Sequence, residues 1–164
     1  MIKTNNLIEP QFIKKYPSEY PLESYFSYVA NLVPPEFFIS VAAMLSPEFT
    51  ILDDHVLLSN NCKNLDNDIS FLNKFGNNKT EREKSINLFC VSDFYTVYVG
   101  EGYVFPEEKW FNIELQNKYA DILQHYWKQQ LKLVLPEKSF LFLRGTEFQG
   151  ETGLCLTFFE NLNC

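Results

Sequence analysis

The sequence predicts an α+β protein in which a small antiparallel sheet packs against several helices. Short runs rich in β-branched and aromatic residues, each pair separated by turn residues, indicate hairpins at about 49–58 and 140–159. Apolar residues recur at helical spacing over about 112–134, which predicts a long amphipathic helix. A chain of 164 residues has the usual length of one domain, so we expect 1–164 to form a single globular domain.

The N-terminal part is expected to contain an arm and two helices. Prolines interrupt residues 1–20, which predicts a partly ordered arm. Residues 21–46 are predicted to form a helical pair with a corner at Pro34-Pro35, because proline suits the first helical position. The second helix has apolar residues at three- and four-residue steps and ends before Pro47. Its apolar content is so dense that we expect it to be buried at the centre of the core.

The next segment is predicted to be a two-residue hairpin. Two β-rich runs within 49–58 flank Asp53-Asp54, and aspartate tolerates the backbone conformation of a tight turn. A single bent strand is the alternative. Because the apolar content of residues 34–58 is too dense for a surface segment, we expect this helix and hairpin to be the centre of the core.

The middle of the chain alternates polar connections with short helices. An Asn-rich connection at 59–68 precedes a short apolar helix that Gly76 ends. Thr80 and Glu83 have the spacing of a capping box, which predicts the start of another helix. Residues 94–105 alternate aromatic and β-branched residues around two glycines, which favours a further hairpin. A helical extension followed by a loop is the alternative there.

The C-terminal part is predicted to be one long helix and one hairpin. Pro136 ends the helix, whose broad apolar face comprises Leu115, Tyr119, Ile122, Leu123, Tyr126, Trp127, Leu131 and Val134. The final hairpin is expected to enclose a long loop from Gly145 to Gly153. Its first strand is apolar on both faces, with Phe140 and Phe142 on one and Leu141 and Leu143 on the other. That pattern is typical of a strand that is central or covered on both sides.

Charge and composition restrict the class of protein. The net charge is −7 and no basic block is present, which disfavours binding to nucleic acid and to anionic membranes. No apolar run has the length of a signal peptide or a membrane span, so we expect a cytoplasmic protein with free thiols. Aromatic residues make up 16% of the chain, which predicts a core rich in aromatic rings.

Few residues are arranged for chemistry. The chain has two histidines, no C-x-x-C pair and no phosphate-binding loop, so we expect no metal and no other cofactor. Asp53, Asp54 and His55 are contiguous and form a partial ligand set, but a polar hairpin tip is the favoured interpretation. A thiol nucleophile at Cys62 or Cys90 would need His55 as its base, and nothing in the sequence brings these residues together.

Three charged residues near the last hairpin are further candidates. Arg144 ends an apolar strand, where it is expected to pair with Glu160 or Glu147, and the alternative is binding of an anionic group. Glu147 and Glu151 lie in the predicted loop and are interpreted as solvated charges rather than a catalytic pair.

We therefore expect a non-catalytic, cytoplasmic protein that binds another protein. Small size, acidity and surplus aromatic residues are bulk properties shared with many bacterial immunity proteins, which suggests an immunity-type or inhibitor protein with a basic protein partner. Loops 59–68 and 145–153 are expected to present the contact. A subunit or self-associating scaffold, including a homo-oligomer, is the alternative, followed by an enzyme with an unrecognised site. The candidate binding residues are Asp53, Asp54, His55, Arg144, Glu147 and Glu151.

Overall fold

The computed structural model describes residues 34–62, 76, 78–95, 97–99, 102–104, 113–148 and 150–163. Its internal contacts divide the chain into two compact units, Met1–Met44 and Leu45–Cys164. The single domain expected over 1–164 therefore stays a prediction. The predicted arm at 1–20, the first helix of the predicted pair and the connection at 63–68 lie outside the described residues.

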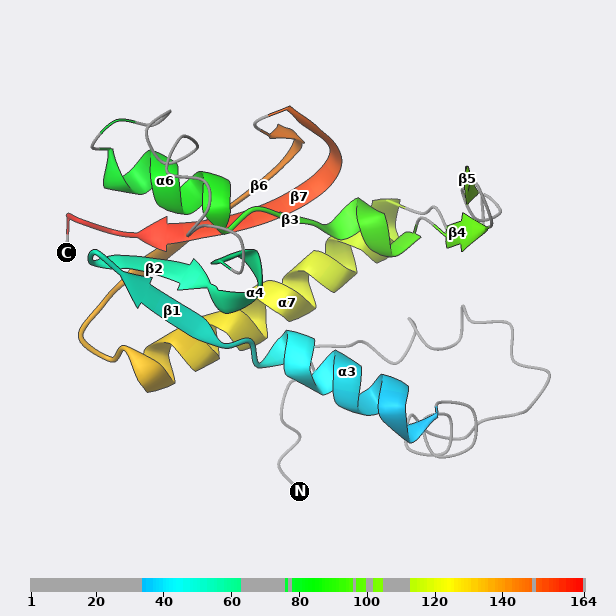
Figure 1. Ribbon diagram of the computed structural model, residues 1–164, viewed down its shortest axis with the longest axis horizontal. Coiled ribbons are helices and arrows are strands. Elements are labelled where there is room, and N and C mark those ends of the chain that lie inside the picture. Colours follow the sequence, from blue (N-terminus) through cyan, green and yellow to red (C-terminus); the bar gives the residue numbers. More distant parts are fainter. Residues whose placement is uncertain are drawn as a thin grey trace, which may run out of the picture. The chain divides into compact units, whose positions relative to one another are not determined.

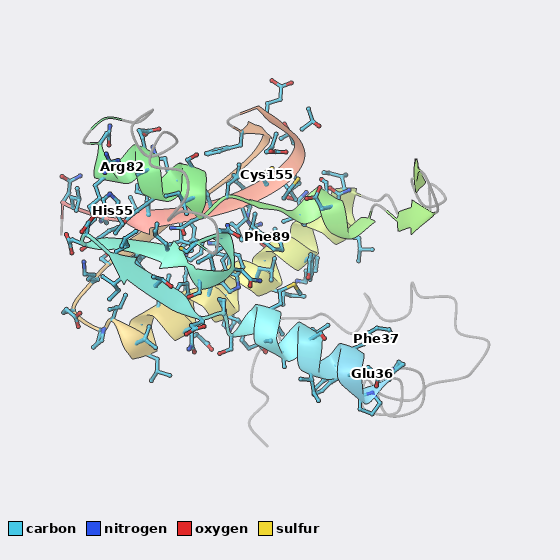
Figure 2. All side chains as sticks on the ribbon, viewed as in Figure 1. Glu36, Phe37, His55, Arg82, Phe89 and Cys155 are labelled. Carbon is cyan, nitrogen blue, oxygen red and sulfur yellow. The ribbon has the colours of Figure 1, made fainter. Side chains whose placement is uncertain are left out.

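Helix α3 (Pro35–Leu45) begins where the prolines predict it. The carbonyl of Pro34 accepts hydrogen bonds from the N–H groups of Phe37 and Phe38, at 3.0 and 3.2 Å. None of its residues is buried, and Phe37 and Ile39 are 61% and 66% exposed. Figure 2 labels Phe37 and Glu36 in the first turn. The prediction that this helix is buried is wrong, because an apolar stripe shows which face could be covered but not what covers it.

The hairpin predicted at 49–58 is present. Strands β1 (Phe49–Leu52) and β2 (His55–Leu58) pair antiparallel, with Phe49 opposite Leu58 and Leu52 opposite His55. This arrangement rules out the single bent strand. The one-turn helix α4 (Ser59–Cys62) follows β2 directly, so the first residues of the predicted connection are helical.

The main sheet has three antiparallel strands in the order β3-β7-β6 (Figure 1). They are β3 (Phe89–Cys90), β7 (Glu151–Glu160) and β6 (Phe140–Phe148). The short 3₁₀ helix η2 (Val91–Tyr95) follows β3, and β4 (Val97–Val99) pairs with β5 (Gly102–Val104), as the hairpin prediction for 94–105 requires. The three hairpins do not share one sheet, since β1–β2 and β4–β5 each pair separately.

The long loop predicted between Gly145 and Gly153 is wrong, because both glycines lie within strands. Gly145 is at a register shift in β6, and Gly150, with φ of +93°, is at the actual turn. Gly153 has φ of +98°, and a Cβ atom there would lie 2.5 Å from the hydroxyl of Ser92. Glycine is therefore required at 153 by a close neighbour and a left-handed backbone, not by a loop.

Two helices cover opposite faces of β7 (Figure 1). On one face lies α6 (Lys79–Ile86), where the hydroxyl of Thr157 donates to the carbonyl of Lys84 at 2.7 Å. On the other lies α7 (Ile113–Val134), the long helix predicted at 112–134. Because successive strand residues point to opposite faces, Phe158 of β7 points toward α7. The α+β class is thus confirmed.

The core is built around the ring of Phe158. Rings of four aromatic residues surround it with centroids 5.5–6.2 Å away, which are those of Phe49, Trp127, Phe140 and Phe142. The rings of Phe49, Trp127 and Phe140 meet it edge-on and that of Phe142 is tilted. Edge-on contacts stabilise aromatic pairs beyond the area that they bury. The prediction of an aromatic core is confirmed by this cluster.

The apolar face of α7 is narrower than predicted. Leu123, Trp127 and Leu131 are buried, whereas Tyr126 and Val134 are exposed. The width of an apolar stripe on a helix does not show how much of the stripe is buried. Tertiary packing decides how much of it a neighbouring element covers. In the part of the chain that the structure describes, no helix has the length and apolar character needed to cross a membrane.

The capping box predicted at Thr80 and Glu83 is not formed. Asn78 is the N-cap of α6, and its side-chain oxygen accepts the N–H of Glu81 at 3.2 Å. Thr80 lies inside the helix and Glu83 is completely buried. Asparagine serves equally well as an N-cap, so the helix begins two residues earlier and Glu83 is available for a tertiary contact.

Candidate functional site

The candidate site begins at the turn between β1 and β2. Asp53 and Asp54 both have positive φ, of 46° and 65°. Positive φ at both central residues defines the turn that best matches the twist of a two-residue hairpin. Aspartate adopts this conformation more readily than most residues with a Cβ, so the sequence allows the turn locally.

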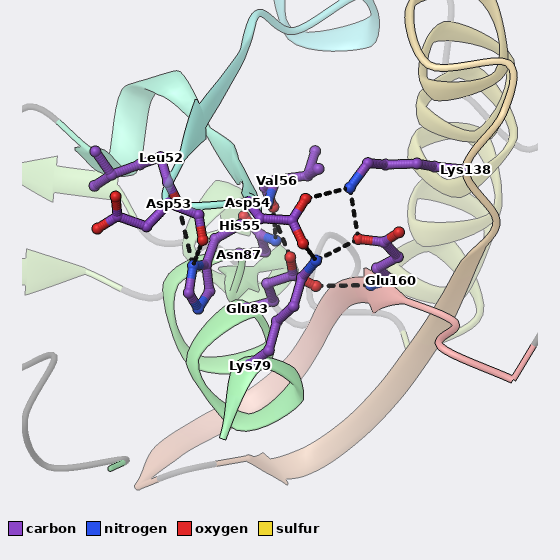
Figure 3. Close-up of polar contacts among 10 residues, drawn as sticks. All are labelled: Leu52, Asp53, Asp54, His55, Val56, Lys79, Glu83, Asn87, Lys138 and Glu160. Atoms are coloured by element: carbon purple, nitrogen blue, oxygen red, sulfur yellow. Dashed lines mark hydrogen bonds and ion pairs between the residues drawn. The ribbon is translucent and has the colours of Figure 1, made fainter. Parts of the chain in front are cut away.

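Asp54 belongs to a ring of four charges that lies beside the turn (Figure 3). Its two carboxylate oxygens accept hydrogen bonds from Lys79 at 2.7 Å and Lys138 at 2.9 Å. Both ammonium groups also contact one oxygen of Glu160, at 2.6 and 2.9 Å. Positive and negative groups alternate, and the ring joins the hairpin, α6, the segment before β6 and the end of β7. Asp54 is the exposed member, with 71% of its side chain accessible.

The ring keeps all four groups charged near neutral pH. Hydrogen bonds from Lys138 and Lys79 lower the pKa of Asp54 to about 2. Burial would raise the pKa of Glu160, but the hydrogen bonds from both lysines outweigh burial and lower it. Hydrogen bonds to the two carboxylates raise the pKa of Lys138, and they raise the pKa of Lys79 against the opposing effect of burial. Each lysine is neutralised by two carboxylates, so the ring is a structural tie and offers no positive site to an anion.

His55 has a structural role at the same turn. Its Nδ1 lies 3.1 Å from the carbonyl oxygen of Leu52 and 3.0 Å from that of Asp53. Carbonyl oxygens only accept, so Nδ1 carries the proton and fixes the ring over the turn. Among the described residues, no group of three or more His, Cys, Asp or Glu side chains could hold a metal ion. Asp53, Asp54 and His55 lie together at the tip of the β1–β2 hairpin.

Two buried polar side chains, one on α6 and one at its C-cap, connect the hairpin to β7. The carboxylate of Glu83 accepts the N–H of Val56 at 2.9 Å with one oxygen and the N–H of Glu160 at 2.7 Å with the other. Asn87, one turn later, accepts the N–H of Leu58 at 2.8 Å and donates to the carbonyls of Val56 and Phe158 at 2.8 and 3.1 Å. These bonds satisfy backbone groups that would otherwise be buried without partners.

Arg144 neither pairs across the hairpin nor faces a free anion. Its guanidinium contacts Asp121 at 2.7 Å and Gln124 at 2.8 Å, both on α7. The predicted pairing with Glu160 or Glu147 is therefore wrong. In β6, Arg144 lies on the same face as Phe140 and Phe142, and α7 covers that face, which brings Asp121 within reach.

Glu147 and Glu151 lie at the opposite end of the β6–β7 hairpin from Glu160. Glu160 is opposite Phe140, whereas Glu151 is opposite Phe148. The nine residue steps from Glu151 to Glu160 correspond to about 30 Å of strand. The six candidate residues consequently do not form one site: Asp53, Asp54 and His55 share the hairpin tip, Arg144 binds α7, and the two glutamates are exposed at the far end.

The described cysteines are free thiols whose reactive, deprotonated form is disfavoured by burial. Cys90 is opposite Cys155 in the β3–β7 pair, and all three described cysteines are free thiols. Burial raises the pKa of Cys62 and Cys90, and it raises the pKa of Cys155 to about 12. A thiol with a raised pKa carries little of the nucleophilic thiolate at neutral pH.

Comparison with known proteins identifies no relative of this chain. No family model matches the chain, and neither the curated proteins nor the solved structures contain a significant match. The candidate site is thus defined by its own geometry.

The residues that sequence reasoning missed are Lys79, Lys138, Glu160, Glu83 and Asn87. Lys79, Lys138 and Glu160 are far apart in the chain and converge only after the strands and helices pack. Glu83 and Asn87 did leave a signal, since they are polar residues four apart on the same side of a helix as Ile86. A polar pair beside a buried apolar residue indicates side chains that point into the protein.

Proposed function

We propose that this chain is a non-catalytic protein that binds a basic protein partner. The observation that carries the proposal is the unequal exposure of its charges. Of 13 described Asp and Glu residues, 10 are exposed, whereas only Lys128 and Lys132 are exposed among 8 described Lys and Arg residues. The surface of the described part is therefore more acidic than the overall composition indicates.

Internal ion pairs explain this inequality. Lys79 and Lys138 are held by Asp54 and Glu160, Lys84 by Glu81, and Arg144 by Asp121. Each base lies partly buried with its long side chain along the protein, as such side chains commonly do. Excess carboxylates remain in water, where they attract positive partners over distances comparable to the screening length.

The far end of the β6–β7 hairpin is the surface we propose for the first contact. Glu147 and Glu151 are exposed there, and neither has an ion-pair partner among the described residues. Asp93 and Glu151 both act on the thiol of Cys155, so Asp93 lies at the same end. Phe148 is half-buried, follows Glu147 in the sequence and lies opposite Glu151 in the strand pair. Its ring offers an aromatic anchor.

An inhibitor or immunity-type role in the cytoplasm is the form of this function that we propose. A strongly acidic surface with an aromatic anchor supports capture of a basic protein, because complementary charge raises the rate of encounter and a buried ring supplies affinity. Such a role requires no catalytic group of this chain.

The test is capture of partners from the native lysate by the tagged chain at low salt. We expect a protein partner with a basic isoelectric point, whose association rate falls as salt is added. Recovery of nucleic acid, or of an acidic protein that binds independently of salt, would contradict the proposal.

Two charge variants locate the contact. Glu147→Gln with Glu151→Gln is expected to slow association at low salt, because two carboxylates leave the proposed surface. Glu36→Gln with Glu137→Gln removes the same charge from other exposed positions and serves as the matched control. Equal slowing by the two double variants would place the contact elsewhere.

A further inference from the structure

Strand β6 has the sequence of a central strand but lies at the edge of its sheet. Residues 140–144 are apolar on both faces up to Arg144, a pattern typical of strands covered on both sides. In the order β3-β7-β6, however, no described strand pairs with the outer edge of β6. The backbone groups along that edge form a template for another strand.

The leucines of β6 are exposed because α6 covers the neighbouring strand instead. Leu143 is opposite Thr157 and Leu141 is opposite Phe159, and both β7 residues contact Lys84 of α6. Leu141 and Leu143 extend the same face and remain 46% and 38% exposed. Residues 140–144 contain no proline and no lysine, the residues that commonly protect an edge, and the register shift begins only at Gly145.

We propose that this edge pairs with β6 of a second copy of the chain, antiparallel and centred on Phe142. Two identical antiparallel strands are related by a twofold axis perpendicular to the sheet. Residues directly opposite each other must point to the same face, so this axis passes at a residue position and not between two successive residues. Centring on Phe142 places Leu141 opposite Leu143 of the second copy on one face. On the other face, Phe140 lies opposite Arg144 of the second copy, a favourable contact of an aromatic ring with a cation.

The charges along the edge favour a second copy over the basic partner proposed above. Arg144 is the one charged residue in 140–144, and Asp121 already pairs with it. A basic strand would therefore meet a cation and no free carboxylate along this segment. A register centred on Arg144 would place two guanidinium groups opposite each other, which disfavours it against the register centred on Phe142.

The helices allow such a pairing on the leucine face. Three strand spacings would separate the two β7 strands by about 14 Å, which exceeds the diameter of about 10–12 Å of a helix with its side chains. The two α6 helices would then flank the four leucines. A contact of five residues per strand is smaller than a standard interface of about 1,600 Å², so we infer a weak dimer with a dissociation constant in the micromolar range or above.

The first test measures the mass of the purified full chain by sedimentation. Between about 1 and 500 µM, near 0.15 M salt, the mass should rise from that of a monomer toward that of a dimer. Leu141→Lys should weaken the dimer, so that the same rise in mass needs a chain concentration at least tenfold higher. Leu133→Lys, the same change at an exposed leucine of α7, is the control and should leave it unchanged. A chain that stays monomeric throughout, or a larger effect of the control, would overturn the proposal.

The second test addresses the register. In a mixture of Leu141→Lys and Leu143→Glu chains, pairing centred on Phe142 places the new lysine opposite the new glutamate and leaves the other leucine pair intact. The mixture should associate more strongly than either variant alone. Equal association would refute this register. Because only the purified chain is used, neither result depends on whether a basic partner exists.

Discussion

Single side chains, rather than strand pairing, join the β1–β2 hairpin to the main sheet. Glu83 and Asn87 make five hydrogen bonds with the backbones of β2 and β7. Their side chains accept three of these bonds, and Asn87 donates the other two. The two carboxylate oxygens of Glu83 are both acceptors facing N–H groups, which an amide could not replace. One residue thus fixes the relative position of two elements that are about 100 positions apart in the chain.

Glu83→Gln should destabilise the protein, because the amide would turn a donor toward one of the two buried N–H groups. Leaving one such group unsatisfied costs about 1–3 kcal/mol of unfolding free energy. Urea titration of the variant measures the loss. Glu81→Gln on the same helix removes only a partly exposed pair with Lys84 and should change stability by less than about 1 kcal/mol. Equal losses would mean that Glu83 is not the tie.

The ion pairs of Asp54 are expected to make the stability of the protein fall at low pH. The pKa of Asp54 lies at about 2 in the folded chain against an ordinary 3.8, so its contribution is fully present above pH 4 and is lost as pH falls toward 2. The lowered pKa of Glu160 acts in the same direction. Thermal melts of the native chain should therefore fall between pH 4 and 2 by more than melts of Asp54→Asn. Asp53→Asn, which alters the other turn residue, should behave like the native chain.

At the scale of elements, α7 stabilises the core through a narrow stripe. Trp127 contacts both Phe89 and Phe158, at centroid distances of 5.5 and 6.2 Å, and is almost completely buried. Trp127→Ala should lower the unfolding free energy by about 3–5 kcal/mol, through lost burial and the cavity left behind. Lys132→Ala on the same helix is exposed and should change it by less than about 0.5 kcal/mol. Similar small effects in denaturant titrations would contradict the assigned helix face.

The position of β6 shows that the apolar pattern of a strand does not determine whether the strand is central or at the edge of its sheet. Leu141 and Leu143 give the strand an apolar second face, which the single chain leaves exposed. The strand β7, with the same kind of pattern, is covered by α6 and α7. Two similar strands thus have different surroundings, because only β7 lies between the two helices.

At the scale of the whole molecule, we predict that stability depends on neither a metal nor a disulfide. Cys62, Cys90 and Cys155 are free thiols, and no described group of side chains could hold a metal ion. Thermal melts with and without chelator should superimpose, as should melts with and without reductant. A lower melting temperature in chelator would indicate a metal site, and a lower one in reductant would indicate a disulfide.

Local sequence determined the elements whose physical causes are local. Proline placed the start of α3, the apolar repeat placed α7, and two aspartates placed the β1–β2 turn, because each depends on backbone preferences within a few residues. The α+β class followed from the same signals. The charge of −7 also predicted an acidic protein, although not which charges remain exposed.

Tertiary structure decided what covers each element and which distant residues meet. The sequence could not show that α3 lies exposed, that Gly153 makes room for Ser92, or that Arg144 pairs with α7. Lys79, Lys138 and Glu160 form a ring with Asp54 although up to 106 positions separate them. Coulomb attraction and hydrogen bonding act over a few ångströms in space, and distance along the chain does not determine distance in space.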